Sequence, residues 1–169
     1  IFMNFLQQPK KLSKYSAYFE NSLNSLDKRY PDKMEVDALY ADLYLKTKEF
    51  RKAADYLKTL ATSSESKYIY WDQLLSIYSY LGNFDKMYHY GQKGLETFDN
   101  KPRIYLLSGI GALQTNRTDT AITLFKEGLK HIQDSKSMRV QFYTQLGEAY
   151  HQTENFRQSD QYFQNVMEL

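Results

Sequence analysis

Apolar residues recur at intervals of three and four along the chain, which is the spacing of one side of an α-helix. Helices are predicted over residues 10–29, 34–46, 50–61, 68–81, 84–98, 102–114, 118–132, 136–152 and 156–167. No stretch keeps the alternation of a β-strand over a useful length. The pattern therefore predicts an all-α fold.

Turn residues separate these segments. Pro31 disfavours helix at Tyr30, Gly82 suits a helix end with Asn83 as the next N-cap, and Pro102 suits a first helical turn. Residues 1–8 resemble the end of a buried helix that Pro9 closes.

The helices repeat in register. Trp71, Leu75, Tyr78, Phe84 and Met87 have counterparts 34 residues earlier and later, and a fourth copy follows after 38 more. Such a period indicates stacked helical hairpins. We expect one continuous solenoid domain, cut from a longer array: a partial repeat at 1–33, then repeats at 34–67, 68–101, 102–139 (with a four-residue insertion) and 140–169.

Large and small residues alternate in the repeated positions. Trp71, Tyr105 and Tyr143 are predicted to insert between helices. The small residues are predicted to let helix backbones approach, because a bulky side chain there would strain the stack: Ala41, Ala53, Gly94, Gly109, Ala121, Gly128 and Gly147.

The motif Tyr143-x-x-Leu146-Gly147-x-x-Tyr150, followed by Phe156 and Phe163, resembles the tetratricopeptide repeat. The resemblance covers residues 34–169 and implies a right-handed α–α superhelix, a solenoid of antiparallel helix hairpins. Asp37, Leu75, Met87 and Thr118 depart from the family pattern. Pentatricopeptide repeats, which bind RNA, have a similar period, but the near-neutral charge and the Gly/Ala/Tyr pattern disfavour them.

In this family the first helix of each hairpin lines a concave groove. The resemblance implies a mixed polar surface that suits an extended peptide or a partner helix, although plain solvated surface is the commoner role for any single one of these residues. The candidate groove residues are Asp42, Lys46, Asp72, Gln73, Ser76, Tyr80, Arg103, Ile110, Gln114, Gln145, Glu148 and His151, with Leu106 in the wider set. One subfamily binds a terminal carboxylate with a clamp of side chains in this groove. Of the residues at the corresponding positions here, only Arg103 could serve, so no such clamp is predicted.

Aromatic residues are abundant, with 16 Tyr and 10 Phe, and they gather between residues 68 and 90. Trp71, Tyr78 and Phe84 are predicted to be core. Tyr80 is predicted to be an exposed contact, with Tyr70 and Tyr90 as further candidates.

The composition and the spacing of reactive residues argue against several classes of function. The net charge of +2 argues against nucleic acid, and the absence of cysteine excludes disulfides and thiol chemistry. The three histidines are far apart, no two carboxylates stand out as a catalytic pair, and Ser108–Gly111 fails as a phosphate loop because it lies inside a helix. We therefore expect no enzyme, metal or cofactor. No apolar run reaches the roughly 20 residues of a membrane span, no signal peptide is evident, and the compartment stays open.

The sequence predicts a protein-interaction scaffold that binds a peptide or partner protein in its groove. Two alternatives remain: the sensor or regulatory region of a larger enzyme or transcription regulator, and a structural solenoid that self-associates or serves envelope assembly.

Overall fold

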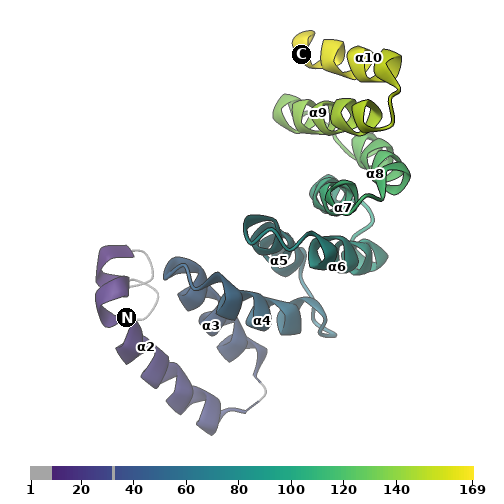
Figure 1. Ribbon diagram of the computed structural model, residues 1–169. Coiled ribbons are helices and arrows are strands. Elements are labelled where there is room, and N and C mark those ends of the chain that lie inside the picture. Colours follow the sequence, from purple (N-terminus) through teal and green to yellow (C-terminus); the bar gives the residue numbers. More distant parts are fainter. Residues whose placement is uncertain (1–8, 32) are drawn as a thin grey trace. The chain divides into compact units, whose positions relative to one another are not determined.

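The computed structural model describes residues 9–31 and 33–169, and over these residues it contains helices and no strand (Figure 1). The helices are α2 (Pro9–Arg29), α3 (Met34–Lys46), α4 (Phe50–Ala61), α5 (Tyr68–Tyr80), α6 (Phe84–Thr97), α7 (Pro102–Gln114), α8 (Thr118–Lys130), α9 (Lys136–Gln152) and α10 (Phe156–Met167). The predicted all-α repeat fold is confirmed. One expectation is wrong: Pro9 begins a helix instead of ending one, in a position where its missing N–H costs nothing. The helix expected over residues 1–8 lies outside the described residues.

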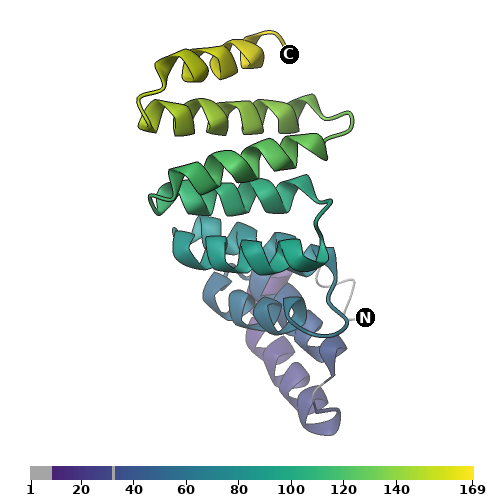
Figure 2. The same ribbon diagram turned by 90° about the vertical axis from the view of Figure 1, so that its right-hand side faces the viewer.

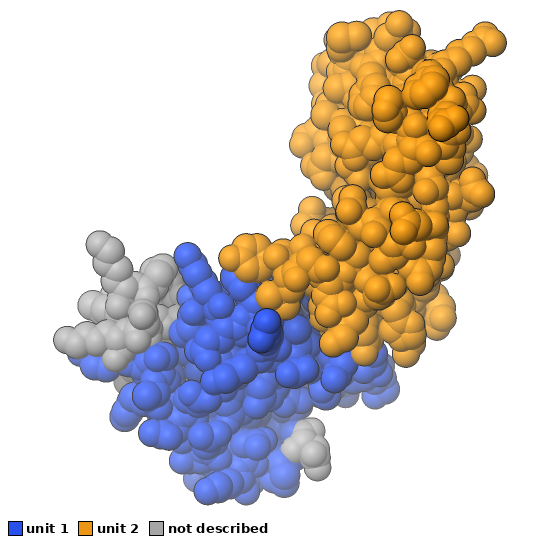
Figure 3. All heavy atoms as spheres, in the orientation of Figure 1, with its two compact units in different colours: residues 1–77 blue, residues 78–169 orange. Residues whose placement is uncertain are grey.

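The chain divides into two compact units, residues 1–77 and residues 78–169, coloured separately in Figure 3. In unit 1, α2 lies against α3, and α3 pairs with α4. In unit 2, each helix from α6 to α10 contacts the next, and α7 also contacts α9. Figure 2 shows α7, α8, α9 and α10 as successive layers, which are antiparallel hairpins stacked on one another.

The turn inside each hairpin has one repeated conformation. Lys48, Gly82, Asn116 and Glu154 all have a positive φ, between 57° and 65°. The amide of the next residue in each turn donates to a carbonyl five positions back, at 2.8–2.9 Å. This is a helix C-terminal motif that needs a left-handed residue. The turns therefore repeat in the same register as the sequence.

Gly82→Ala should lower the free energy of unfolding by about 1 kcal/mol, because a Cβ disfavours the left-handed conformation. Nothing lies within 4 Å of a Cβ built at Gly82, so the loss would be conformational alone. Gly82→Asn should lower the free energy of unfolding by less than Gly82→Ala does, because Asn116 already adopts this conformation. Urea unfolding midpoints of the three proteins would measure the effect. Equal stability of Gly82→Ala and the parent would contradict it.

Paired tyrosines join the two helices of three hairpins. Tyr44 lies against Tyr56, Tyr78 against Tyr90 and Tyr150 against Tyr162, with ring centroids 5.6–5.8 Å apart. A lysine sits over the first ring of each pair at 4.8–5.8 Å, a contact worth about 0.5–1 kcal/mol at an exposed site. Six of the 16 tyrosines thus take part in hairpin packing. Tyr90, one of the candidate exposed contacts, is partly buried in such a pair.

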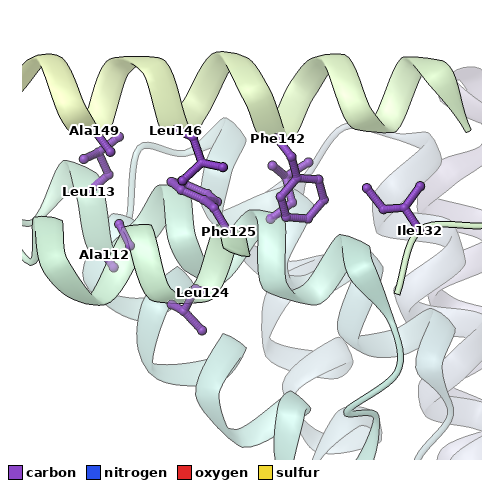
Figure 4. Close-up of a cluster of buried hydrophobic side chains, with 10 residues drawn as sticks. Ala112, Leu113, Leu124, Phe125, Ile132, Phe142, Leu146 and Ala149 are labelled. Atoms are coloured by element: carbon purple, nitrogen blue, oxygen red, sulfur yellow. The ribbon is translucent and has the colours of Figure 1, made fainter. Parts of the chain in front are cut away.

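The buried cluster of unit 2 shows how one hairpin covers another. Phe142, Leu146 and Ala149 project from α9 toward α7 and α8, where Phe125 is fully buried (Figure 4). Gly109 was predicted to admit a helix backbone; a Cβ there would instead lie 2.3 Å from the Phe125 ring. The same holds at Gly128 with Phe142 and at Gly147 with Phe163, at 2.5 and 2.7 Å. These three glycines make room for aromatic rings.

Hydrogen bonds from two tyrosine hydroxyls of α3 link it to α2 in unit 1. Tyr40 Oη donates to Asn24 Oδ1 at 2.6 Å, and Tyr44 Oη donates to Glu20 Oε1 at 2.5 Å. Phe19 and Leu23 of α2 are buried beside them. Burial raises the pKa of Tyr40 to about 12, and burial together with the hydrogen bond to Glu20 raises the pKa of Tyr44.

These shifts predict a loss of stability at high pH. The folded state holds the phenolic protons more tightly than the unfolded chain, whose tyrosines titrate near pH 10. The stabilisation is therefore complete below about pH 10 and decreases as the pH rises toward 12. Urea midpoints at pH 8, 10 and 11.5 should fall in that order. The double variant Tyr40→Phe/Tyr44→Phe should show a shallower decline, and an identical pH profile would contradict the assignment.

Candidate functional site

The first helices of the last two hairpins, α7 and α9, contact each other in unit 2. We call the predicted groove residues of these two helices the wall. It consists of Arg103, Ile110 and Gln114 of α7 and Gln145, Glu148 and His151 of α9. Gln114, Glu148 and His151 are exposed, and the other three are partly buried. Tyr80, at the end of α5, also belongs to unit 2 and is 73% exposed.

The remaining predicted residues lie in unit 1. Lys46 is exposed, and Asp42 is partly buried beside it in α3. Their side chains form an ion pair at 2.7 Å, a helical i,i+4 contact worth about 0.3–0.5 kcal/mol. Asp72, Gln73 and Ser76 are partly buried in α5.

Leu106 does not belong to the wall. Its side chain is only 3% exposed, because it lies in the hydrophobic cluster that α9 covers. Its helical position matched a groove position, but a leucine gains more from burial than from facing solvent.

Two side-chain contacts involve the α9 part of the wall. Gln145 Nε2 donates to Glu148 Oε2 at 3.0 Å, and the His151 ring meets Phe156 edge-on at 5.3 Å between centroids. Glu148 and His151 also line a shallow pocket with Gln152 and Phe163. The wall thus offers amide, carboxylate and imidazole groups beside exposed aromatic surface.

Phe163 is the pocket residue that sequence reasoning missed as a contact. It occupies a repeat position whose counterpart, Phe125, is fully buried, so the pattern predicted packing. Phe163 is 39% exposed. The difference is that α9 covers Phe125, whereas no described helix covers Phe163 in the same way, and the repeat position alone carries no signal of that difference.

The described part of the chain shows no cluster of metal-binding side chains. No group of three or more His, Asp or Glu residues gathers within residues 9–31 and 33–169 in a way that could hold a metal ion. Among those same residues, every helix is too short or too polar to cross a membrane.

Comparisons with known proteins bear on the fold. The family model described as tetratricopeptide repeat matches residues 140–169. MamA from Desulfovibrio magneticus RS-1 has a similar solved structure, with a TM-score of 0.72 and 11% identity over 98% of this chain and 94% of that one. YrrB, described as a TPR protein with an unusual peptide-binding site, has a TM-score of 0.74 and 12% identity over 94% of this chain and 82% of that one. BtubC from P. vanneervenii has a TM-score of 0.71 and 17% identity over 96% of this chain and 74% of that one. No curated protein sequence matches this one.

Proposed function

Because residues 140–169 are a tetratricopeptide repeat and the chain folds as tetratricopeptide-repeat proteins do, we propose that it is a protein-interaction scaffold without catalytic activity. Helical-repeat proteins use extended surfaces to bind partners. We further propose the repeat boundaries 34–67, 68–101, 102–139 and 140–169, which the shared conformation of the four turns supports.

The observation that carries the proposal is the wall itself. Its side chains come from two helices in contact, and they combine hydrogen-bonding groups with apolar surface at Ile110. An extended peptide exposes main-chain N–H and C=O groups that such amides and carboxylates can satisfy. Gln114 and Gln145 can each donate and accept, so the wall suits a peptide or a partner helix, and YrrB gives an example of peptide binding on this fold.

Alanine variants of Tyr80 and of a wall residue test this function. We expect Tyr80→Ala and Gln145→Ala each to weaken peptide binding several-fold, because each removes a group that can contact the ligand. The measurement is binding of the chain to an array of immobilised peptides, followed by titration of the peptides it retains. Glu96→Ala, an exposed position on α6, serves as the control. If Tyr80→Ala and Gln145→Ala both retain every interaction of the parent, neither Tyr80 nor the wall is the binding surface.

A further inference from the structure

A second surface lies at the end of unit 2, on α10 and the adjoining part of α9. Phe156, Asp160, Phe163 and Met167 follow one another at intervals of four, three and four residues, so they share one side of α10. The three apolar side chains are 55%, 39% and 78% exposed. Together with Glu148 and His151 of α9, these residues form what we call the end face.

The preceding hairpin shows what covers such a face. Phe125 lies over Gly109 as Phe163 lies over Gly147, so the two hairpins are built alike. In the earlier one, α9 rests on Phe125 through Phe142, Leu146 and Ala149, which are spaced i, i+4 and i+7 (Figure 4). A helix with apolar residues at that spacing is therefore the shape that fits the end face.

The end face differs from the preceding hairpin in charge. In register with the repeat, Glu148 takes the place of Ile110, Asp160 that of Ile122 and His151 that of Leu113. Asp160 is exposed and has no ion pair with a described residue, and the partner of Glu148 is the neutral Gln145. The apolar stripe is thus bordered by uncompensated negative charge, which favours a basic partner.

One position also limits the size of the partner's side chain. A Cβ at Gly128 would lie 2.5 Å from Phe142, so the glycine is what admits that ring. Val166 stands in the equivalent place of α10. A helix on the end face must therefore present a smaller residue than phenylalanine there.

We propose that the end face binds a basic amphipathic helix of a partner protein, with apolar residues at i, i+4 and i+7 and lysine or arginine beside them. Two copies of this chain would bring their acidic side chains together if the same face met itself, which disfavours a symmetric dimer. Glu148 and His151 belong to both surfaces, but the three exposed apolar residues of the end face all lie on α10, which contributes no residue to the wall.

Peptides derived from the α9 sequence provide the probe. The basic probe is residues 134–153 with Phe142→Leu, Gln145→Lys and Glu148→Lys, and the acidic probe has Phe142→Leu and Gln145→Glu, with Glu148 unchanged. Fluorescence anisotropy would measure the binding of each labelled peptide to the full chain. We expect the basic probe to bind at least tenfold more tightly, and added salt to reduce the difference.

Variants of the chain locate the binding. The double variant Phe156→Gln/Met167→Gln should weaken binding of the basic probe at least tenfold, and Asp160→Asn should weaken this binding several-fold. Circular dichroism melting checks that these surface changes leave the fold intact. Tyr80→Gln, at another highly exposed aromatic position, should leave the affinity unchanged and so separates the end face from the contact proposed at Tyr80.

Three results would overturn the proposal. The end face is not the site if the double variant binds the basic probe as the parent does. The charge argument fails if both probes bind equally. The occupant is a second copy of the chain if sedimentation shows concentration-dependent association that the double variant abolishes.

Discussion

Replacing Phe125 with alanine should lower the free energy of unfolding by about 3–5 kcal/mol. The side chain is fully buried at the centre of the cluster in which α7, α8 and α9 meet. Its ring packs edge-on against Phe142, with centroids 6.2 Å apart, and fills the space over Gly109. Alanine would leave a cavity that helices on both sides could close only in part. Urea unfolding of the full chain, followed by circular dichroism, would measure the loss.

Phe163→Ala is the matched control. Phe163 makes the same contact with Gly147 in the next hairpin, but 39% of its surface is exposed. Truncation there removes less buried area and leaves no closed cavity, so the loss should be less than half of that at Phe125. If the two variants lost equal stability, the packing of α9 on Phe125 would not be what stabilises unit 2.

The helices and their register could be predicted from local sequence because local residues determine them. Gly82 and Asn116 accept the left-handed conformation that ends a helix, and Pro102 marks the start of α7. Lys48 and Glu154 adopt the same conformation without being typical turn residues. There the register, carried over from the other hairpins, predicted the turn that the single residue did not.

The positions of individual side chains were less predictable, because they depend on which helix covers which. Leu106 and Ile110 stand one helical turn apart in α7, yet Leu106 is buried under α9 and Ile110 remains partly exposed. Phe125 and Phe163 share one motif position and differ in exposure for the same reason. A repeat pattern describes what its copies share. It therefore does not predict differences in exposure between equivalent residues of two copies.

The glycines show the same limit. The sequence predicted close contacts at Gly109, Gly128 and Gly147, and the contacts exist, but aromatic rings make them. The close approach of a helix backbone occurs at Gly111, which the sequence had offered only as part of a failed phosphate loop. A Cβ at Gly111 would lie 2.7 Å from the amide nitrogen of Tyr88 and 3.0 Å from the carbonyl oxygen of Phe84, both in α6.

Gly111→Ala should therefore destabilise unit 2 by about 2–3 kcal/mol. This is the net expected after alanine's advantage over glycine inside a helix, about 1 kcal/mol, has offset part of the collision. The cost is high because backbone atoms of α6 cannot rotate away as a side chain can, so α6 and α7 would have to separate. Urea unfolding of the full chain would measure the change.

Gly147→Ala provides the contrast, since it places the same methyl group in a helix interior against a movable neighbour. Its Cβ would meet the ring of Phe163 at 2.7 Å, and that ring is partly exposed and can tilt toward solvent. The gain in helix propensity should then nearly cancel the cost of the shift, which leaves the stability within about 1 kcal/mol of the parent. Similar losses at the two positions would mean that ring and backbone contacts constrain the helices alike. A large loss at Gly111 alone would show that the α6–α7 backbone contact constrains the helices more than the ring contact at Gly147 does.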